Sequence, residues 1–344
     1  MSGTSLDGLD VCHCTFHYSN NHWDFSLDCA AGYSYSDDMK QKLGTDAQKM
    51  SALDFITFHS AYGKFLGECV NDFIAQHDLH PDIIASHGHT IFHEPKKGVM
   101  FQIGDGAAIA AVTRIPVVSD FRRLDIMLGG QGAPLVPIGD RLLFGNYDYC
   151  LNIGGFSNIS FEKDGKRIAF DVSPVNYVIN HYTRQIGLEM DRDGDIARSG
   201  QINQDLLNRL NGMDYYKQPG PKSLGREWVE SDIFPLIESY HLPLADSLRT
   251  FYEHAAQQVA NVIVSSSTPS LFITGGGAYN KFLIERIEAL SHVQIVIPDK
   301  KIIEYKEALI FAFLGALYIS DQPSCLSSVT GATVDNIGGM LFKI

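Results

Sequence analysis

The sequence predicts a mixed α/β protein with two domains that face a cleft. After residue 80, apolar stretches typical of strands alternate with stretches of helical periodicity, a pattern that favours this class. A strand, a glycine-rich turn and a second strand recur in both halves of the chain, and this recurrence indicates an internal duplication. A length of 344 residues is sufficient for two sizeable cores.

We expect an N-terminal α/β domain over residues 1–130 and a C-terminal α/β domain over residues 131–344, whose last residues pack back on the first domain. Apolar residues make up 45% of the chain and charged residues 19%, as in an ordinary globular protein. The net charge of −13 argues against nucleic acid or an anionic membrane as a partner. A phosphate ligand would therefore need backbone N–H groups and a metal ion to bind.

The N-terminus lacks a basic region followed by a long apolar run, so we expect no signal peptide. The longest nearly apolar run, residues 308–319, is too short to span a bilayer and predicts a buried helix. The six cysteines are scattered without a CxxC pattern, which predicts neither a zinc site nor a disulfide framework. These features favour a protein of the reducing cytoplasm.

The first eight residues form a glycine-, serine- and threonine-rich loop. It could be a simple turn, or its N–H and hydroxyl groups could bind a phosphate, with Asp7 or Asp10 holding a metal ion on that phosphate. A phosphate-binding loop normally follows a strand. Either residues are missing upstream of Met1, or the first strand begins only at Leu9.

Residues 54–76 predict a long amphipathic helix, and residues 82–85 predict a strand that leads into SHGHTIFHEP, residues 86–95. The three histidines and one glutamate of this segment could bind a metal, but no distant fourth ligand is marked. Hydrogen bonding to a sugar is the better interpretation, because imidazole both donates and accepts. Two further strands and a small-residue helix between them are expected at residues 99–103, 116–119 and 106–113.

The segment Asp120–Pro134 places two arginines and two aspartates before a glycine-rich turn. It could be a surface charge cluster. We favour an arginine that clamps a carboxylate with two hydrogen bonds, followed by a flexible hinge between the domains.

The central stretch, residues 149–180, predicts strands at 150–153, 157–161 and 168–170, then a helix over 174–186. The pair Gly154-Gly155 follows the first of these strands, and without Cβ atoms its N–H groups can approach a phosphate. Asp171 is a lone carboxylate at the end of the third strand.

Residues 218–227 are rich in turn formers and predict a lid or a linker. A helix over 248–265 precedes a strand at 271–274, the turn Gly275–Gly277 and Asn280, a suitable N-cap. Glu307 begins the buried helix and should lie near the site. Three glycine turns at strand ends, with the carboxylate strand among them, predict a split nucleotide site.

The repeated strand, glycine turn and hairpin resemble the actin, hexokinase and Hsp70 superfamily, in which two duplicated RNase H-like α/β domains face a cleft. Eight motifs from Met1 almost to the C-terminus resemble, in order, the anhydro-N-acetylmuramic acid kinases of bacterial cell-wall recycling. They are MSGTSLDGLD, SHGHTIFHEP, DFRRLDIMLGGQGAPLVP, LNIGGFSNIS, AFDVSPVN, PKSLGRE, ITGGGAYN and SSVTGA.

The resemblance implies an ATP- and Mg²⁺-dependent enzyme that phosphorylates the 6-oxygen of 1,6-anhydro-N-acetylmuramic acid. Water opens the anhydro bridge in the same reaction, and the products are N-acetylmuramate 6-phosphate and ADP. It also implies a cytoplasmic homodimer whose ligands are ATP and a small sugar.

By the same resemblance, Asp171 is the base that deprotonates the water, an arginine holds the lactyl carboxylate of the sugar, and Asp7 binds Mg²⁺. The expected ATP-binding residues are Gly3, Thr4, Ser5, Leu6, Asp7, Gly8, Asp10, Gly154, Gly155, Asn158, Gly275, Gly276, Gly277, Asn280 and Glu307. The expected substrate-binding residues are His87, His89, Thr90, His93, Glu94, Asp120, Arg122, Asp125 and Gln131.

The chain differs from the family pattern at several positions. It reads FDVSPVN where the family usually reads FDTGPGN, so Ser173 and Val175 replace glycines. Three other positions also differ: the family commonly has aspartate at Asn180, glutamine at His89 and tryptophan at Phe92. The strand that would precede the first loop is missing. Two alternatives therefore stay open: a related amino-sugar kinase without ring opening, and a catalytically quiet sugar- or nucleotide-binding protein. Asp171 beside three glycine turns favours an enzyme.

Overall fold

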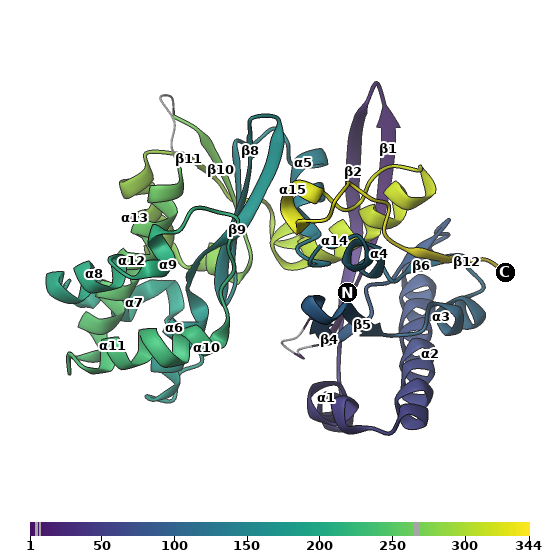
Figure 1. The fold of residues 1–344 in the computed structure, drawn as a ribbon, viewed down its shortest axis with the longest axis horizontal. Helices are drawn as coiled ribbons and strands as arrows, with labels where there is room; N and C mark the ends of the chain where they lie inside the picture. The colour runs from purple at the N-terminus through teal and green to yellow at the C-terminus, as the bar shows by residue number, and fades with distance from the viewer. Residues whose placement is uncertain (4–5, 7, 264–267) are drawn as a thin grey trace. The chain divides into compact units, whose positions relative to one another are not determined.

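The computed structural model describes residues 1–3, 6, 8–263 and 268–344. These residues form two compact units, each a mixture of helices and strands, which confirms the predicted α/β class (Figure 1). Unit 1 comprises Met1–Leu143 and Tyr305–Ile344, and unit 2 is Phe144–Glu304. The sequence instead suggested units of residues 1–130 and 131–344. None of the helices in the described ranges is both long and apolar enough to cross a membrane.

The difference at the boundary comes from the packing of α5 (Val136–Leu142) against the part of α14 (Lys300–Ile319) that belongs to unit 1. A Cβ atom at Gly139 would lie 2.6 Å from the Ile310 side chain, so glycine is what allows α5 to approach α14 so closely. The two helices also share a buried ion pair of 2.6 Å between Asp140 Oδ1 and Lys306 Nζ. Residues 131–143 therefore belong with unit 1, although the hydrophobic pattern alone does not mark them so.

The described residues of unit 1 form three small sheets. The strands β1 and β2 form an antiparallel hairpin, β3 and β6 pair in parallel with β12 antiparallel to β6, and β4 pairs antiparallel with β5. In chain order its elements are β1 (Gly8–Ser19), β2 (His22–Ser34), α1 (Asp37–Gln41), η1 (Lys42–Asp46), η2 (Ala47–Lys49), α2 (Ala52–His77), β3 (Ile84–Ala85), β4 (His89–Glu94), η3 (Pro95–Lys97), β5 (Val99–Ile103), α3 (Gly106–Thr113), β6 (Val117–Ser119), α4 (Arg123–Met127), α5, most of α14, α15 (Ser327–Thr330) and β12 (Met340–Phe342).

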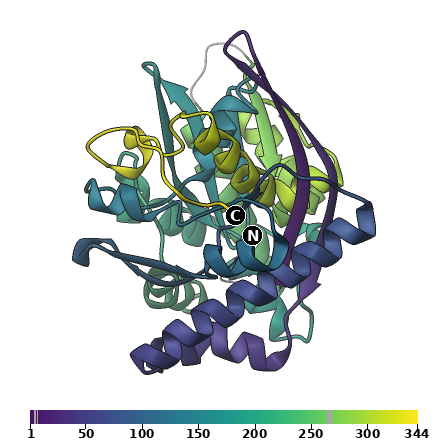
Figure 2. The same cartoon turned by 90° about the vertical axis from the view of Figure 1, so that its right-hand side faces the viewer.

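The long helix α2 organises the core of unit 1 and confirms the helix predicted at 54–76 (Figure 2). Ser51 caps its N-terminus by accepting a hydrogen bond from the Asp54 N–H group at 3.2 Å. Its buried face presents Tyr62 and Leu66 to the core. A Cβ atom at Gly63 would lie 2.6 Å from the carbonyl oxygen of Asp105, so this glycine lets α3 begin directly against α2.

Unit 2 is built on one five-stranded sheet with the order β11-β10-β7-β8-β9. The strands β11, β10 and β7 are parallel, whereas β7, β8 and β9 run antiparallel to one another. Its elements are β7 (Tyr149–Ile153), β8 (Phe156–Lys163), β9 (Lys166–Pro174), α6 (Asn176–Arg184), η4 (Arg192–Gly194), α7 (Asp195–Ser199), α8 (Gln204–Asn211), α9 (Asp214–Lys217), α10 (Arg226–Trp228), η5 (Val229–Ile233), α11 (Phe234–Glu238), α12 (Leu244–Val262), β10 (Ser270–Thr274), η6 (Gly276–Tyr279), α13 (Lys281–Ser291) and β11 (Gln294–Val296).

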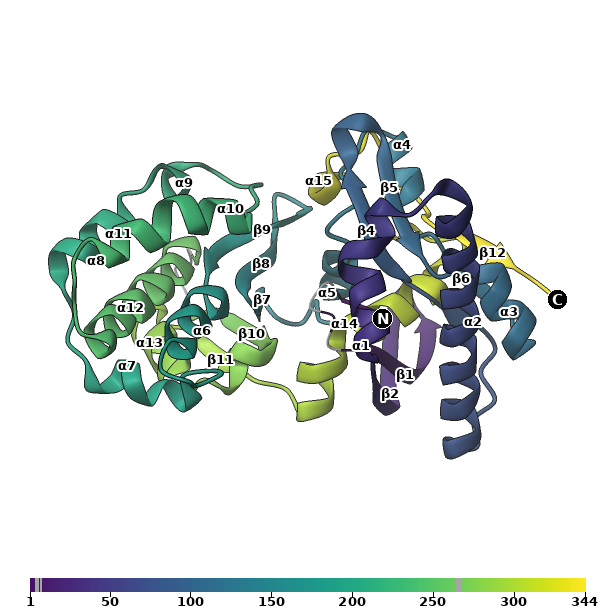
Figure 3. The same ribbon diagram turned by 90° about the horizontal axis from the view of Figure 1, so that it is seen from below.

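The helices of unit 2 cover one face of this sheet (Figure 3). Apolar side chains of β7, such as Leu151 and Ile153, pack there in one core with α12. The predicted strands are confirmed, but β9 runs on to Pro174 and α6 begins only at Asn176. The prediction that Asp171 ends its strand is therefore wrong, because the ladder between β8 and β9 continues beyond it to Pro174.

A buried carboxylate joins α12 to α13. Glu253 is 4% exposed and accepts hydrogen bonds from Arg286 Nε and Nη2, both at 2.9 Å, and from Arg249 Nη1 at 2.8 Å. Burial alone would raise the pKa of Glu253, but the hydrogen bonds from the two guanidinium groups hold it below its usual range. The carboxylate therefore stays charged and holds the two helices together.

We expect Glu253→Ala to lower the free energy of unfolding by about 3 kcal/mol, because it leaves two partly buried arginines without their shared partner. Urea denaturation measures this loss. The matched control is Glu285→Ala on α13, the helix that carries Arg286; it removes an exposed pair with Arg198 and should change stability little. Equal effects of the two substitutions would contradict the role of Glu253.

Candidate active site

Asp171 lies in a row of polar residues that crosses four strands of unit 2. The strand register pairs Asp171 with Asn158, Asn158 with Asn152, and Asn152 with Thr274. Directly paired residues of neighbouring strands point to the same face of a sheet, so these four side chains share one face. It is the face opposite the core residues Leu151 and Ile153. Asn152 and Thr274 were not predicted from the sequence, although each lies within two residues of a predicted glycine turn.

Two of the predicted glycine turns lie at the same end of the sheet as this row. Gly154-Gly155 joins β7 to β8, and Gly275–Gly277 follows β10. Gly275 has a φ of +81°, and a Cβ atom there would lie 2.7 Å from Asn152 Oδ1. A Cβ atom at Gly277 would lie 2.2 Å from Ile153, whereas one at Gly276 would meet nothing within 4 Å. Packing against β7 therefore requires Gly275 and Gly277, while Gly276 faces open space.

The helix α6 starts against the first of these turns. The N–H groups of Val175 and Tyr177 donate to the carbonyl oxygen of Gly155 at 2.8 and 3.1 Å, and the N–H group of Asn176 donates to that of Gly154 at 3.3 Å. The turn thereby satisfies donors that a helix start would otherwise leave unpaired. The carbonyls of the glycine pair face the helix, and the Gly154 N–H group donates to the Phe156 carbonyl oxygen at 3.1 Å, which leaves the Gly155 N–H group as the possible phosphate contact.

Asp171 is held by α9 and by the segment that follows it. Its Oδ2 atom accepts a hydrogen bond from the Leu224 N–H group at 2.8 Å, and its carbonyl oxygen accepts one from the Tyr215 hydroxyl at 2.6 Å. Its own N–H group donates to the carbonyl oxygen of Lys222 at 3.1 Å. This segment overlaps residues 218–227, for which the sequence predicted a lid or linker. The structure shows that it packs against the carboxylate.

Burial raises the pKa of Asp171 above the usual range of a carboxyl group, while the hydrogen bond from Leu224 opposes this shift. A carboxylate with a raised pKa is a stronger proton acceptor. Among the described residues no group donates a hydrogen bond to Oδ1. Asp171 therefore has one oxygen fixed by the backbone and a second that can meet a ligand or a water molecule.

In unit 1, Arg122 and His87 form a buried pair. Arg122 Nε donates to His87 Nε2 at 3.0 Å, and Arg122 Nη1 donates to the Gly132 carbonyl oxygen at 2.7 Å. Burial and the neighbouring guanidinium group lower the pKa of His87 well below its usual value, so its ring is neutral. Burial lowers the pKa of Arg122 to about 10, which leaves it charged at neutral pH.

Glu307, on α14, interacts electrostatically with the same group of residues. Burial raises its pKa, and the positive charge of Arg122 opposes this shift. The negative charge of Asp10 adds a smaller raising effect. Glu307 thus interacts electrostatically with Asp10 and Arg122, two other residues predicted for the site from distant parts of the sequence.

Asp125 does not fit the predicted contact with a substrate. Its side chain is completely buried, and Oδ2 accepts a hydrogen bond from the Gly132 N–H group at 2.8 Å. Oδ1 accepts from Thr330 Oγ1 at 2.7 Å and from Asn336 Nδ2 at 3.1 Å. Asp125 therefore fixes the glycine turn that the sequence interpreted as a hinge, and its oxygens face protein groups.

The remaining predicted sugar contacts lie on β4 and the loops near it. Burial lowers the pKa of His89 to about 4, and its Nδ1 atom lies 2.9 Å from Ser2 Oγ in the first loop. Elsewhere on this strand, Thr90 Oγ1 accepts a hydrogen bond from Gln102 at 3.2 Å, and His93 Nε2 donates to the Gln131 carbonyl oxygen at 3.0 Å.

Two predicted sugar contacts carry acidic side chains. Glu94 is exposed and lies 3.4 Å from Lys97. Asp120 is partly buried, and burial raises its pKa against the opposing charge of Arg123. Within the described ranges no three metal-binding side chains gather as a cluster.

The first loop is described only in part, since Thr4, Ser5 and Asp7 lie outside the described residues. Leu6 has a φ of +61° and donates its N–H group to the Gly3 carbonyl oxygen at 3.2 Å. A Cβ atom at Gly8 would lie 2.5 Å from the carbonyl oxygen of Tyr33, so glycine is required where the loop enters β1. In unit 2, Asn280 caps α13, as predicted, by accepting from the Leu283 N–H group at 3.1 Å.

An α/β chain with glycine turns and a partly buried carboxylate at the end of one sheet is typical of phosphotransferases that use a nucleotide. The family model described as anhydro-N-acetylmuramic acid kinase matches residues 1–343. The chain therefore belongs to the anhydro-N-acetylmuramic acid kinase family.

Three relatives with that name illustrate the likeness. The protein of Aliivibrio fischeri is 36% identical, over 97% of this chain and 95% of its own length. The proteins of Sulfurovum sp. and Pseudomonas savastanoi pv. phaseolicola are each 34% identical, over 99% of this chain and 97% of their own lengths. The likeness therefore covers both units.

We expect Gly276→Val to weaken ATP binding by at least about tenfold without lowering the melting temperature, because a side chain there meets open space in the protein but would meet a nucleotide. Calorimetric titration with ATP and with the sugar measures the two affinities. Gly277→Val is the control, since its clash with Ile153 should lower the melting temperature. Lost sugar binding with intact ATP binding would place this turn on the acceptor side.

Proposed function

We propose that this chain uses ATP to phosphorylate the 6-oxygen of 1,6-anhydro-N-acetylmuramic acid while water opens the anhydro bridge. The products would be N-acetylmuramate 6-phosphate and ADP. Membership of the family supports an ATP-dependent kinase of the cell-wall recycling route with this sugar as acceptor. The observation that carries the ring-opening step is Asp171, a partly buried carboxylate with a raised pKa beside two glycine turns.

In the proposed reaction Asp171 is the general base. It takes a proton from water as the water oxygen bonds to the anomeric carbon, and the bond between that carbon and the 6-oxygen breaks. The released 6-oxygen keeps the electron pair of that bond and attacks the γ-phosphorus. The bond between the γ-phosphorus and the bridging oxygen then breaks, and ADP leaves with its electron pair. The Leu224 N–H group would hold Oδ2 of Asp171, so that Oδ1 meets the water.

The glycine turns are proposed to bind the nucleotide, with Gly154-Gly155 near its phosphates and Gly275–Gly277 near its adenosine part. Mg²⁺, when bound, would neutralise charge that develops on the phosphates. Asp7 and Asp10 would hold it, and this donor set fits, because Mg²⁺ is usually bound by one or two carboxylates together with substrate phosphates. The repulsion between the charges of Asp10 and a second carboxylate, Glu307, favours a cation at this position.

Arg122 is proposed to bind the lactyl carboxylate of the sugar. Its Nε and Nη1 atoms already donate to His87 and Gly132, so the sugar would be held by the remaining N–H groups of the guanidinium. His87 thereby orients the arginine. We also propose a cytoplasmic homodimer, which light scattering coupled to size-exclusion chromatography would test for its oligomeric state.

Incubation with the anhydro sugar, Mg-ATP and H₂¹⁸O should yield a sugar phosphate that carries one ¹⁸O atom at the anomeric position. Mass spectrometry of the product, with fragmentation, locates the label and the phosphate. A labelled N-acetylmuramate released without phosphate would separate hydrolysis from transfer. A phosphorylated product without label, whose anhydro ring is intact or whose acceptor differs, would contradict the ring-opening kinase.

We expect Asp171→Asn to lower kcat by about 10²–10⁴-fold with substrate binding largely retained, because the amide keeps the shape but cannot take a proton. Steady-state kinetics and thermal melting are measured on one preparation. Asp214→Asn, an exposed carboxylate of the same unit, serves as the control for the loss of a charge. A variant that melts earlier yet turns over within a few-fold of the parent would assign Asp171 a structural role only.

A further inference from the structure

A series of hydrogen bonds between buried side chains of unit 1 ends at His89. The Tyr35 hydroxyl donates to Ser2 Oγ at 2.7 Å, and the hydroxyl oxygens of Tyr35 and Tyr62 lie 2.7 Å apart. Ser2 Oγ lies 2.9 Å from His89 Nδ1. We call these four residues the His89 network. None of them is more than 4% exposed, so bulk water does not replace their partners.

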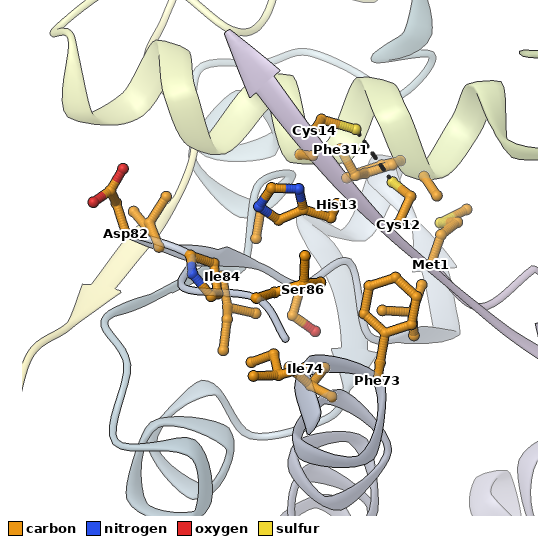
Figure 4. A pocket seen from close by; sticks show the side chains of 18 of the residues that line it. Met1, Cys12, His13, Cys14, Phe73, Ile74, Asp82, Ile84, Ser86 and Phe311 are labelled. Atoms are coloured by element: carbon orange, nitrogen blue, oxygen red, sulfur yellow. Dashed lines mark hydrogen bonds between the residues drawn. The ribbon is translucent and has the colours of Figure 1, made fainter. Parts of the chain in front are cut away.

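The His89 network joins four parts of unit 1 that are distant in sequence. Ser2 belongs to the first loop, Tyr35 directly follows β2, Tyr62 lies on α2, and His89 begins β4. An apolar cavity of about 410 Å³ is lined by other residues of the first loop and α2, such as Met1 and Phe73 (Figure 4). The residues of the network do not line this cavity. Water in the cavity therefore offers their hydroxyl groups no alternative partner.

The hydrogen atoms of the network determine which nitrogen of His89 is protonated. Its three hydroxyl groups supply three hydrogens for three hydrogen bonds. Because the hydrogen of Tyr35 goes to Ser2, the bond between the two tyrosines uses the hydrogen of Tyr62. The Ser2 hydroxyl keeps its own hydrogen, and His89 Nδ1 is its remaining partner in the network. If Nδ1 were a donor, one buried hydroxyl hydrogen would be left over, which is costly.

The ring of His89 is neutral and carries one N–H group. Burial lowers the pKa of His89 to about 4, well below neutral pH. Since Nδ1 accepts from Ser2, the hydrogen of the ring is on Nε2. Among the described residues no acceptor bonds to Nε2, although the residue is only 3% exposed. A buried donor without a partner is unfavourable, so an acceptor on a ligand would complete the network.

We propose that the His89 network fixes the Nε2–H tautomer of His89 and that this N–H group donates to an acceptor oxygen of the sugar. The identity of that sugar rests on the proposed function. Ser2, Tyr35 and Tyr62 are positioning residues, because they act on the sugar only through the ring of His89. The donor favours a sugar with an oxygen at this point and disfavours one with an amino group there, whose hydrogens would face the N–H group.

Glutamine carries the same two groups as this tautomer. Its Oε1 atom can accept from Ser2 while its amide N–H group donates to the sugar, whereas methionine, of similar length, can do neither. The fixed tautomer therefore accounts for a histidine at a position where the family commonly has glutamine.

The tautomer is measured without ATP or sugar, by ¹H–¹⁵N correlation NMR of the full chain with ¹⁵N-labelled histidine rings at neutral pH. The signals of His89 are those absent from the spectrum of His89→Gln. We expect a protonated Nε2 and an unprotonated Nδ1 in the parent, and partial protonation of both in Ser2→Ala. If Ser2→Ala does not fold, Tyr35→Phe replaces it with a shift in the same direction. Tyr33→Phe is the control, because its hydroxyl bonds to no residue of the network.

The contact with the sugar is tested by ligand addition and by kinetics. The anhydro sugar should slow the exchange of Nε2–H with water by at least about tenfold, and ATP alone should not. His89→Met should raise KM for the sugar by about tenfold with kcat within a few-fold, because the bond is present in the ground state and the transition state alike. His89→Gln should keep KM within about threefold of the parent.

A protonated Nδ1 in the parent would overturn the proposal, since Ser2 would then give its hydrogen to Tyr62, with which it also interacts. An unchanged spectrum of Ser2→Ala would overturn it as well. A response of Nε2–H to ATP but not to the sugar would assign the donor to a phosphate oxygen, and no response to either would remove the ligand contact. The ¹⁸O experiment decides the ring opening separately, because a missing label leaves the tautomer and the sugar contact standing.

Discussion

The candidate site of unit 2 depends on the central position of β7. Leu151 and Ile153 of this strand are fully buried in the core, and Asn152, between them, points to the opposite face. Because β7 pairs with β10 and β8 at once, it fixes the ends of both strands and therefore both glycine turns. The missing side chains of Gly275 and Gly277 are what allow the second turn to lie on β7. The position of β7 therefore determines both the packing of the core of unit 2 and the placement of the two glycine turns.

In unit 1, polar side chains are buried, and their hydrogen bonds fix the orientation of Arg122. Arg122, His87 and Asp125 are polar, yet each has its hydrogen bonds to protein groups, so the cost of removing them from water is offset. Burial and the positive charge of Arg122 lower the pKa of His87, so its ring stays neutral and can accept a hydrogen bond from the arginine. The orientation of Arg122 and the shape of the glycine turn at Gly132 therefore depend on each other. A substitution at any one of these residues would disturb the others.

The sequence predicted the helices and strands well, because hydrophobic periodicity and helix caps depend on residues that are close together in the chain. Ser51 marks the start of α2, and the alternation around Asp164-Gly165 marks the hairpin of β8 and β9. The sequence could not show the strand register, so Asn152 and Thr274 were missed. It also could not show that Leu224, far along the chain, donates to Asp171, or that the oxygens of Asp125 face Thr330 and Asn336. Hydrogen bonds between residues distant in sequence leave no periodic signal.

The division of the chain has a consequence for the order in which the protein is made. Unit 2 is one continuous stretch, whereas unit 1 is interrupted after Leu143 and resumes at Tyr305. Synthesis on the ribosome proceeds from the N-terminus, so every residue of unit 2 is available before β12 exists to pair with β6. The unit that begins the chain is therefore the last to be completed. Until then its unfinished sheet exposes a strand edge that the nascent chain must protect.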